Sequence, residues 1–125
     1  YVPGEVAPSH EFYDYDAKYL DPDGAALLVP APLSDNQLHE ITRTACTAYE
    51  ALDLDGLSRV DFFIDKNTGE IFLNEINTIP GFTSISMFPR MCAAGGLAYP
   101  DLIMYLLDLA QKRFRDSRKL RTDRL

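Results

Sequence analysis

The chain of 125 residues has the length of one domain, and its 46% hydrophobic content is ample for a core. This composition argues against intrinsic disorder. The net charge is −7, but seven of the twelve basic side chains lie in residues 112–125, so residues 1–111 carry five basic against seventeen acidic side chains. Such an acidic body argues against nonspecific nucleic-acid binding, whose affinity comes mainly from cationic contacts with phosphates.

Nothing in the sequence indicates a membrane span or an export signal. The longest apolar stretch, residues 102–109, contains Asp108 and is far shorter than the ~20 apolar residues that cross a bilayer. The chain starts at Tyr1 without a basic, signal-like segment, which predicts a soluble segment cut from a longer protein. Cys46 and Cys92 form no CxxC pattern, so we expect buried thiols in a reducing cytoplasm.

The first half of the chain predicts short extended pieces and one helix. Residues 1–19 mix Pro, Gly, Asp and aromatic residues, which indicates a strand followed by an aromatic loop at residues 13–19. A second extended piece is expected at residues 26–29. Ser34, with Gln37 three residues later, has the pattern of a capping box. Apolar residues at helical spacing follow as far as Leu52, so this region is expected to be a helix.

Two strands rich in aliphatic and aromatic residues are predicted at residues 57–66 and 70–77. Residues 67–69 suit a three-residue hairpin loop whose last residue is left-handed. This loop places polar residues opposite one another on one face, in the pairs Lys66 with Glu70, Asp61 with Glu75, and Arg59 with Asn77. The other face is expected to carry Val60, Phe62, Ile64, Phe72 and Ile76. Asn74 interrupts that apolar face, which we interpret as contact with a ligand.

The last third of the chain predicts a loop and two helices. Residues 77–86 contain a Pro-Gly turn and several hydroxyl side chains, which indicates a loop that leads into a short helix ended by Gly95 and Gly96. Pro100 fits the first turn of a final helix that runs to about residue 116 and packs its apolar side in the core. Residues 112–125 are expected to form a basic, solvated helix end or tail of this single domain.

The hairpin predicts a metal site. Asp61, Glu75 and Asn77 supply carboxylate and amide oxygens, the hard ligands that magnesium prefers, and the expected register brings them together. Two carboxylates opposite each other repel unless a metal, a proton or a basic partner lies between them. Arg59 is one such partner, so a solvated salt bridge without further function is the competing interpretation.

The loop after the second strand favours the metal site. Peptide nitrogens near Gly81 and the hydroxyls of Thr83, Ser84 and Ser86 provide donors for an anion directly after the metal ligands. Magnesium on phosphate oxygens, with an arginine against developing negative charge, is the recurring arrangement in phosphoryl transfer. The chain has no Walker-type or dinucleotide glycine loop, so a nucleotide must be held in another way.

These residues resemble a known family. The segments Gly56-Leu-Ser-Arg-Val-Asp-Phe-Phe63 and Asn74-Glu-Ile-Asn-Thr-Ile-Pro-Gly-Phe-Thr-Ser-Ile-Ser86 are similar to the signature of ATP-grasp D-alanyl-D-alanine ligases. Phe12-Tyr-Asp-Tyr-Asp-Ala-Lys-Tyr19 resembles their omega loop, which closes the active site. The resemblance implies an α+β fold, with an antiparallel sheet flanked by helices as the C-terminal lobe of an ATP-grasp enzyme. It also implies that ATP phosphorylates one D-alanine, and that the amine of a second attacks the acylphosphate, for peptidoglycan synthesis.

The resemblance also implies roles for individual residues. Two magnesium ions, or manganese in their place, would be held by Asp61, Glu75 and Asn77. Arg59 and the Gly81 peptide nitrogen would stabilise the oxyanion, and Ser86 would bind the carboxylate of the second D-alanine. In the omega loop, Lys18 would reach the ATP phosphates, Phe12 would lie near the adenine, and Tyr19 would help lock the loop and favour an amine nucleophile. Asn74 stands where the family often has an aliphatic residue beside the adenine.

Two other functions stay open. The metal hairpin is shared by other ATP-grasp carboxylate-amine ligases, although the second loop and Ser86 favour the D-alanine enzymes. The chain is alternatively a noncatalytic metal- or nucleotide-binding module, because members of the family hold the first substrate and grip ATP with segments that precede this region. We therefore expect no turnover from residues 1–125 alone. The complete enzyme is expected to be a cytoplasmic homo-oligomer that joins this part to N-terminal and central segments.

Overall fold

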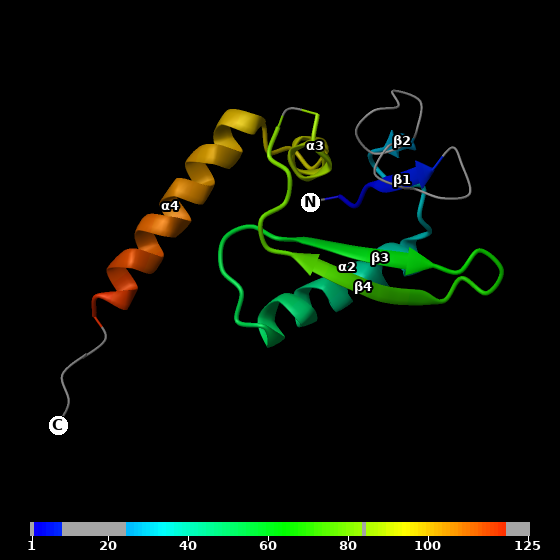
Figure 1. The fold of residues 1–125 in the computed structure, drawn as a ribbon, viewed down its shortest axis with the longest axis horizontal. Helices are drawn as coiled ribbons and strands as arrows, with labels where there is room; N and C mark the ends of the chain where they lie inside the picture. The colour runs from blue at the N-terminus through cyan, green and yellow to red at the C-terminus, as the bar shows by residue number, and fades with distance from the viewer. Residues whose placement is uncertain (1, 9–24, 84, 120–125) are drawn as a thin grey trace.

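The computed structural model describes residues 2–8, 25–83 and 85–119, and within them two antiparallel strand pairs alternate with helices. Figure 1 shows the smaller pair, β1 with β2, apart from the larger hairpin, β3 with β4, and shows α4 extending away from both. The elements in chain order are β1 (Glu5–Pro8), β2 (Ala25–Leu28), α2 (Asp35–Ala51), β3 (Arg59–Ile64), β4 (Ile71–Asn77), α3 (Met87–Ala94) and α4 (Tyr99–Ser117).

Helix α2 begins at the predicted capping box and covers one face of the hairpin. Oγ of Ser34 accepts from the N–H of Gln37 at 3.3 Å, and the Gln37 side chain accepts from the N–H of Ser34 at 3.1 Å. At the other end, the Tyr49 hydroxyl donates to the carbonyl oxygen of Gly56 at 3.1 Å. This bond ties the end of α2 to the segment that enters β3, so the helix sets where the hairpin starts.

The hairpin has the predicted partners at its open end and different ones near its turn. Arg59 lies opposite Asn77 and Asp61 opposite Glu75, as expected. Beyond Asp61 the register shifts, so that Phe62 lies opposite Leu73 and the residue between, Asn74, has no partner. The expected apolar face was therefore wrong for Phe72, because the bulge at Asn74 turns Phe72 to the face of Asp61 and Glu75.

The turn of the hairpin is longer by one residue than the sequence pattern predicts. Asp65 donates its N–H to the Glu70 carbonyl at 2.9 Å, and Gly69 donates its N–H to the Asp65 carbonyl at 2.8 Å. The loop thus comprises residues 66–69, and the expected pair of Lys66 with Glu70 does not form. Gly69 has φ of 74°, so the predicted left-handed position is confirmed. The extra loop residue shifts the strand pairing by one position, and the extra residue at Asn74 shifts it back. Asp61 therefore still lies opposite Glu75.

The core lies where α3 meets α4, and it is small. Cys92 and Leu102 are buried, with 1% and 2% of their surface exposed. The prediction that the apolar side of the last helix is covered was wrong for part of its length, since Leu107 and Phe114 are more than half exposed and Ile103 is 38% exposed. Only the start of α4 contacts α3 closely, and the rest of the helix projects outward (Figure 1). The expectation of two buried thiols was correct for Cys92 and wrong for Cys46, which is exposed.

The basic end of α4 is exposed as far as the structure describes it. Arg113 lies 3.1 Å from Asp55, and Lys119 lies 2.8 Å from Asp116, with all four side chains well exposed to solvent. Residues 120–125 lie outside the described part of the chain. Among the helices of the described residues, none is long and apolar enough to cross a membrane.

Candidate active site

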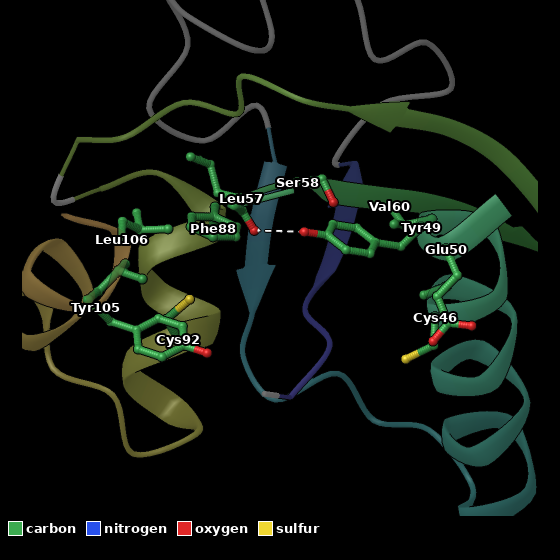
Figure 2. A pocket seen from close by; sticks show the side chains of 13 residues that line it. Cys46, Tyr49, Glu50, Leu57, Ser58, Val60, Phe88, Cys92, Tyr105 and Leu106 are labelled. Atoms are coloured by element: carbon green, nitrogen blue, oxygen red, sulfur yellow. Dashed lines mark hydrogen bonds between the residues drawn. The ribbon is translucent and has the colours of Figure 1, made fainter. Parts of the chain in front are cut away.

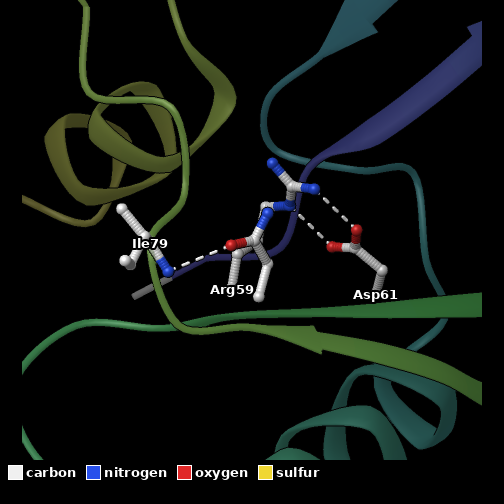
Figure 3. Close-up of polar contacts among 4 residues, drawn as sticks. Arg59, Asp61 and Ile79 are labelled. Carbon is white, nitrogen blue, oxygen red and sulfur yellow. Dashed lines mark hydrogen bonds and ion pairs between the residues drawn. The ribbon is translucent and has the colours of Figure 1, made fainter.

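The candidate site occupies the face of the hairpin that α2 does not cover. Alternation along β3 puts Arg59 and Asp61 on one face and Val60 on the other. Val60 lines a pocket together with Tyr49 of α2. Figure 3 shows Arg59 and Asp61 on the side of the strands opposite to that helix. The register places Glu75 and Asn77 across from them on the same face, so four of the predicted site residues are neighbours.

Arg59 and Asp61 form a bidentate ion pair. Nε of Arg59 donates to Oδ1 of Asp61 at 2.7 Å, and Nη2 donates to Oδ2 at 2.7 Å. The side chains are 22% and 30% exposed, so the pair is partly shielded from water. Short bonds between ionised groups in this fork geometry are stronger than neutral hydrogen bonds. The salt bridge that was the competing interpretation of the sequence is therefore present. It engages Asp61, which is one of the proposed metal ligands.

The oxygen atoms on this face fit a hard divalent cation by their chemistry. Asp61 and Glu75 bring carboxylates from opposite strands, and Asn77 brings an amide two residues after Glu75. The side-chain oxygen of Asn77 accepts from the N–H of Ile79 at 3.0 Å. Within residues 2–8, 25–83 and 85–119, no group of three or more His, Cys, Asp or Glu side chains is placed to hold a metal. A cation here would need the Asn77 amide and nonprotein oxygens as well as the two carboxylates.

The loop after β4 brings Gly81 against Ser86. A β-carbon built on Gly81 would lie 3.0 Å from Oγ of Ser86 and 3.6 Å from its Cβ. The same Oγ accepts from the N–H of Thr83 at 3.1 Å and lies 2.8 Å from the Thr83 hydroxyl. Ser86 also precedes α3 as its N-cap residue, without a side-chain capping bond. The predicted oxyanion and substrate residues therefore sit side by side at the start of a helix, where peptide N–H groups favour anions.

A small aromatic cluster supports this loop, and the sequence pattern did not predict it. The Tyr99 hydroxyl donates to the Phe82 carbonyl at 2.9 Å, and the two rings lie 5.5 Å apart. The ring of Phe88 in α3 lies 6.0 Å from the ring of Phe82, measured between ring centres. Tyr99 is separated from Phe82 by a whole helix in the sequence, so no local pattern could have revealed this contact.

The remaining predicted residues are Asn74 and three residues of the omega loop. Asn74 forms the bulge of β4 and is exposed. Phe12, Lys18 and Tyr19, the omega-loop residues, lie outside the described part of the chain. The structure therefore brings together Arg59, Asp61, Glu75 and Asn77 on the hairpin, and Gly81 with Ser86 on the loop.

An apolar pocket of about 360 Å³ lies on the other face of the hairpin. Figure 2 shows Tyr49, Val60, Phe88, Cys92 and Tyr105 around it, with the bond from the Tyr49 hydroxyl to Gly56 at its wall. Burial, and secondly the nearby charge of Asp55, raise the pKa of Tyr49 above its usual value, so the hydroxyl stays a donor. The pocket separates α2 from α3 and α4, and it contains none of the predicted site residues.

The fold and the site define the C-terminal lobe of the ATP-grasp fold, of α+β class. The family model described as "D-ala D-ala ligase C-terminus" matches residues 1–108, so the chain belongs to this family. A D-alanine–D-alanine ligase of Treponema denticola is 64% identical over 124 residues, which are 99% of this chain and 34% of that protein.

Solved structures agree with this membership. The chain resembles the D-alanine–D-alanine ligase of Coxiella burnetii with a TM-score of 0.72 and 40% identity, over 76% of this chain and 27% of that one. It resembles the VanG D-Ala:D-Ser ligase of Enterococcus faecalis with a TM-score of 0.71 and 39% identity, over 85% of this chain and 30% of that one. The chain spans about a third of the length of the curated relatives that it matches.

Proposed function

We propose that the chain is the metal- and substrate-binding C-terminal part of a cytoplasmic, ATP-dependent D-alanine–D-alanine ligase of peptidoglycan synthesis. The observation that carries the proposal is the pairing of Asp61 with Glu75 and of Arg59 with Asn77 on one uncovered sheet face, directly before the loop that joins Gly81 to Ser86. Family membership and relatives named as D-alanine–D-alanine ligases support the same reaction.

The residues on the hairpin would act on the phosphates of ATP. Asp61, Glu75 and Asn77 are the oxygen donors that would hold two magnesium ions, or manganese in their place. The ions would neutralise charge on the phosphoryl group that passes to the carboxylate of the first D-alanine. In our assignment Lys18 would reach the phosphates, while Phe12 and Asn74 would lie near the adenine.

The residues at the loop would act on the second substrate. Ser86 would bind the carboxylate of the second D-alanine, since its Oγ lies at the start of α3 beside peptide N–H groups. In that orientation the substrate amine would face the acylphosphate. Arg59 and the Gly81 N–H would stabilise the oxyanion of the tetrahedral intermediate, which collapses with release of phosphate. Tyr19 would help hold the omega loop closed over the reacting groups.

The identity of the second substrate is part of the proposal. One of the similar solved structures is a D-Ala:D-Ser ligase, and its overall likeness to this chain is close to that of a D-alanine–D-alanine ligase. The Tyr-Asp-Ala-Lys-Tyr segment that ends at Tyr19 favours an amine nucleophile. We therefore expect no ester formation with D-lactate. The loop does not separate the two amines, so the expectation that turnover with D-alanine exceeds turnover with D-serine at equal concentration rests on the relatives named as D-alanine–D-alanine ligases.

The test uses the complete ligase that would contain this chain, assayed for dipeptide and ADP with D-alanine, ATP and magnesium. Arg59→Ala should lower kcat by about 100-fold or more, as expected for loss of a charged oxyanion donor. Glu75→Gln should raise the magnesium concentration needed for half-maximal rate. Arg43→Ala and Glu70→Gln are the matched controls, because both side chains are exposed and Glu70 lies on the same hairpin, near its turn.

Near-normal turnover of both site variants would leave the Arg59–Asp61 pair as a structural salt bridge and refute the assignment. Residues 1–125 alone are expected to give no ADP or dipeptide, because substrate and nucleotide contacts would come from N-terminal and central segments. Turnover by the isolated chain would show that these segments are dispensable. Light scattering of the complete ligase tests the accompanying expectation of a homo-oligomer.

A further inference from the structure

Asp61 has two possible cationic partners, the guanidinium of Arg59 and a bound divalent cation. Arg59 donates to both carboxylate oxygens, each bond being 2.7 Å long. A carboxylate has about four lone-pair positions, and the fork of the guanidinium uses one on each oxygen. A divalent cation bound to the same carboxylate would lie a few ångströms from a full positive charge, in a site where both side chains are less than a third exposed.

We propose that Arg59 is the internal competitor for the metal ligand Asp61, and that it leaves this carboxylate when a divalent cation is bound. The inference rests on the proposed function, since it takes Asp61 as a metal ligand. It adds that Arg59 has two positions: one on Asp61 and one on an anionic substrate group. The same arginine would thus be available as an oxyanion donor only when the metal site is filled.

The position of Arg59 in the sheet makes the exchange local. Arg59 is the first residue of β3 and lies opposite Asn77, the last residue of β4. The loop that carries Gly81 and Ser86 begins directly after Asn77. The side-chain oxygen of Asn77 accepts a hydrogen bond from the N–H of Ile79. A rotation of the Arg59 side chain, with no movement of the strands, would therefore take the guanidinium from Asp61 toward the first residues of this loop (Figure 3).

The competition predicts that removing Arg59 tightens metal binding. Binding of Mn²⁺ alone to the complete ligase is measured by loss of the free-ion EPR signal, without nucleotide or D-alanine. Arg59→Met, which keeps the apolar length of the side chain, should lower the Kd for Mn²⁺ about twofold to fivefold, the equivalent of one partly exposed ion pair. Arg43→Met on α2 removes the same charge from an exposed position and should leave the Kd close to that of wild type.

The variant Asp61→Asn separates this inference from the proposed function. Weaker Mn²⁺ binding in Asp61→Asn together with tighter binding in Arg59→Met supports both. Weaker binding in Asp61→Asn with an unchanged or weaker affinity in Arg59→Met overturns the competition and leaves the metal site standing. If Asp61→Asn binds Mn²⁺ as tightly as wild type, Asp61 is not a metal ligand, and the proposed competition is overturned as well. General damage to the fold would weaken binding, so it cannot imitate the expected gain.

A second measurement does not depend on the folding of Arg59→Met. The Nε–H resonance of Arg59 in the wild-type ligase is assigned by its absence from Arg59→Lys. Its hydrogen exchange should be slow while Nε donates to Asp61, and should accelerate when magnesium is added to saturation. An Nε–H signal with unchanged shift and exchange rate at saturating magnesium would show that the guanidinium stays on Asp61, and it would overturn the inference.

Discussion

Asp65 shows how one side chain closes the hairpin. Its Oδ1 accepts from the N–H groups of Thr68 and Asn67, each at 2.8 Å. These bonds, with that from Thr68 the larger effect, lower the pKa of Asp65 below its ordinary value of 3.8. The charged form therefore favours the four-residue loop, and it does so from a fully exposed position.

We predict a pH-dependent effect of Asp65→Asn. Because the pKa of Asp65 is lower in the folded than in the unfolded chain, its charge stabilises the fold above about pH 4, and this contribution is lost as the pH falls through the folded-state pKa. Urea titrations should show wild type more stable than Asp65→Asn at pH 6, with the difference shrinking toward pH 2. A difference that is constant from pH 6 to pH 2 would contradict a role for the charge.

The hairpin illustrates how far an element can be predicted from its sequence. The alternation of residues and the position of Gly69 led to the correct pairing of Asp61 with Glu75, but this register holds because the longer loop and the bulge at Asn74 compensate each other. The alternation and Gly69 were not enough to predict the loop length, because the Asp65 side chain stabilises a turn that competes with the three-residue loop. The unexplained Asn74 was the one sign of the bulge. A polar residue within an apolar alternation marks a break in the ladder as readily as a ligand contact.

The bulge at Asn74 is expected to orient the carboxylates of Asp61 and Glu75. Deleting Asn74 would give a continuous ladder in which Asp61 still faces Glu75, but without the added local twist of a bulge. We predict that this deletion leaves the free energy of unfolding unchanged or higher and weakens Mn²⁺ binding by about tenfold, the usual scale of a change in the support of a metal ligand. The control is one extra glycine within residues 66–69, at the far end of the hairpin. Equal Mn²⁺ affinity in the deletion variant and wild type would assign the bulge to packing alone.

At the scale of the whole molecule, the helices were predictable and their burial was not. The capping box of α2 and Pro100 in the first turn of α4 are local signals, and both helices begin where these signals indicate. Burial depends on what lies against a helix, which no apolar spacing reveals. Leu107 belongs to the predicted apolar side of α4, yet it is 51% exposed within the part of the chain that the structure describes. The contact of Tyr99 with Phe82 was hidden because it depends on side-chain placement, whereas the Arg59–Asp61 ion pair was one of the two alternatives that the hairpin predicted.

Two substitutions on α4 test where the core lies. Leu102 is 2% exposed and Leu107 is 51% exposed, although both are leucines of one helix. Leu102→Ala should lower the free energy of unfolding of residues 1–125 by about 2–5 kcal/mol, because it leaves a cavity beside α3. Leu107→Ala makes the same change in helix propensity and should lower the free energy of unfolding by less than about 1 kcal/mol. Equal losses, measured by urea titration, would place the core elsewhere.

The close approach of Gly81 to Ser86 also limits how this loop can evolve. A methyl group at position 81 would crowd a hydroxyl that two contacts with Thr83 already hold in place. Exchanges at the two positions should therefore be epistatic. Alanine at 81 would be harmful beside Ser86 and would add little further loss to a variant that already carries glycine at 86.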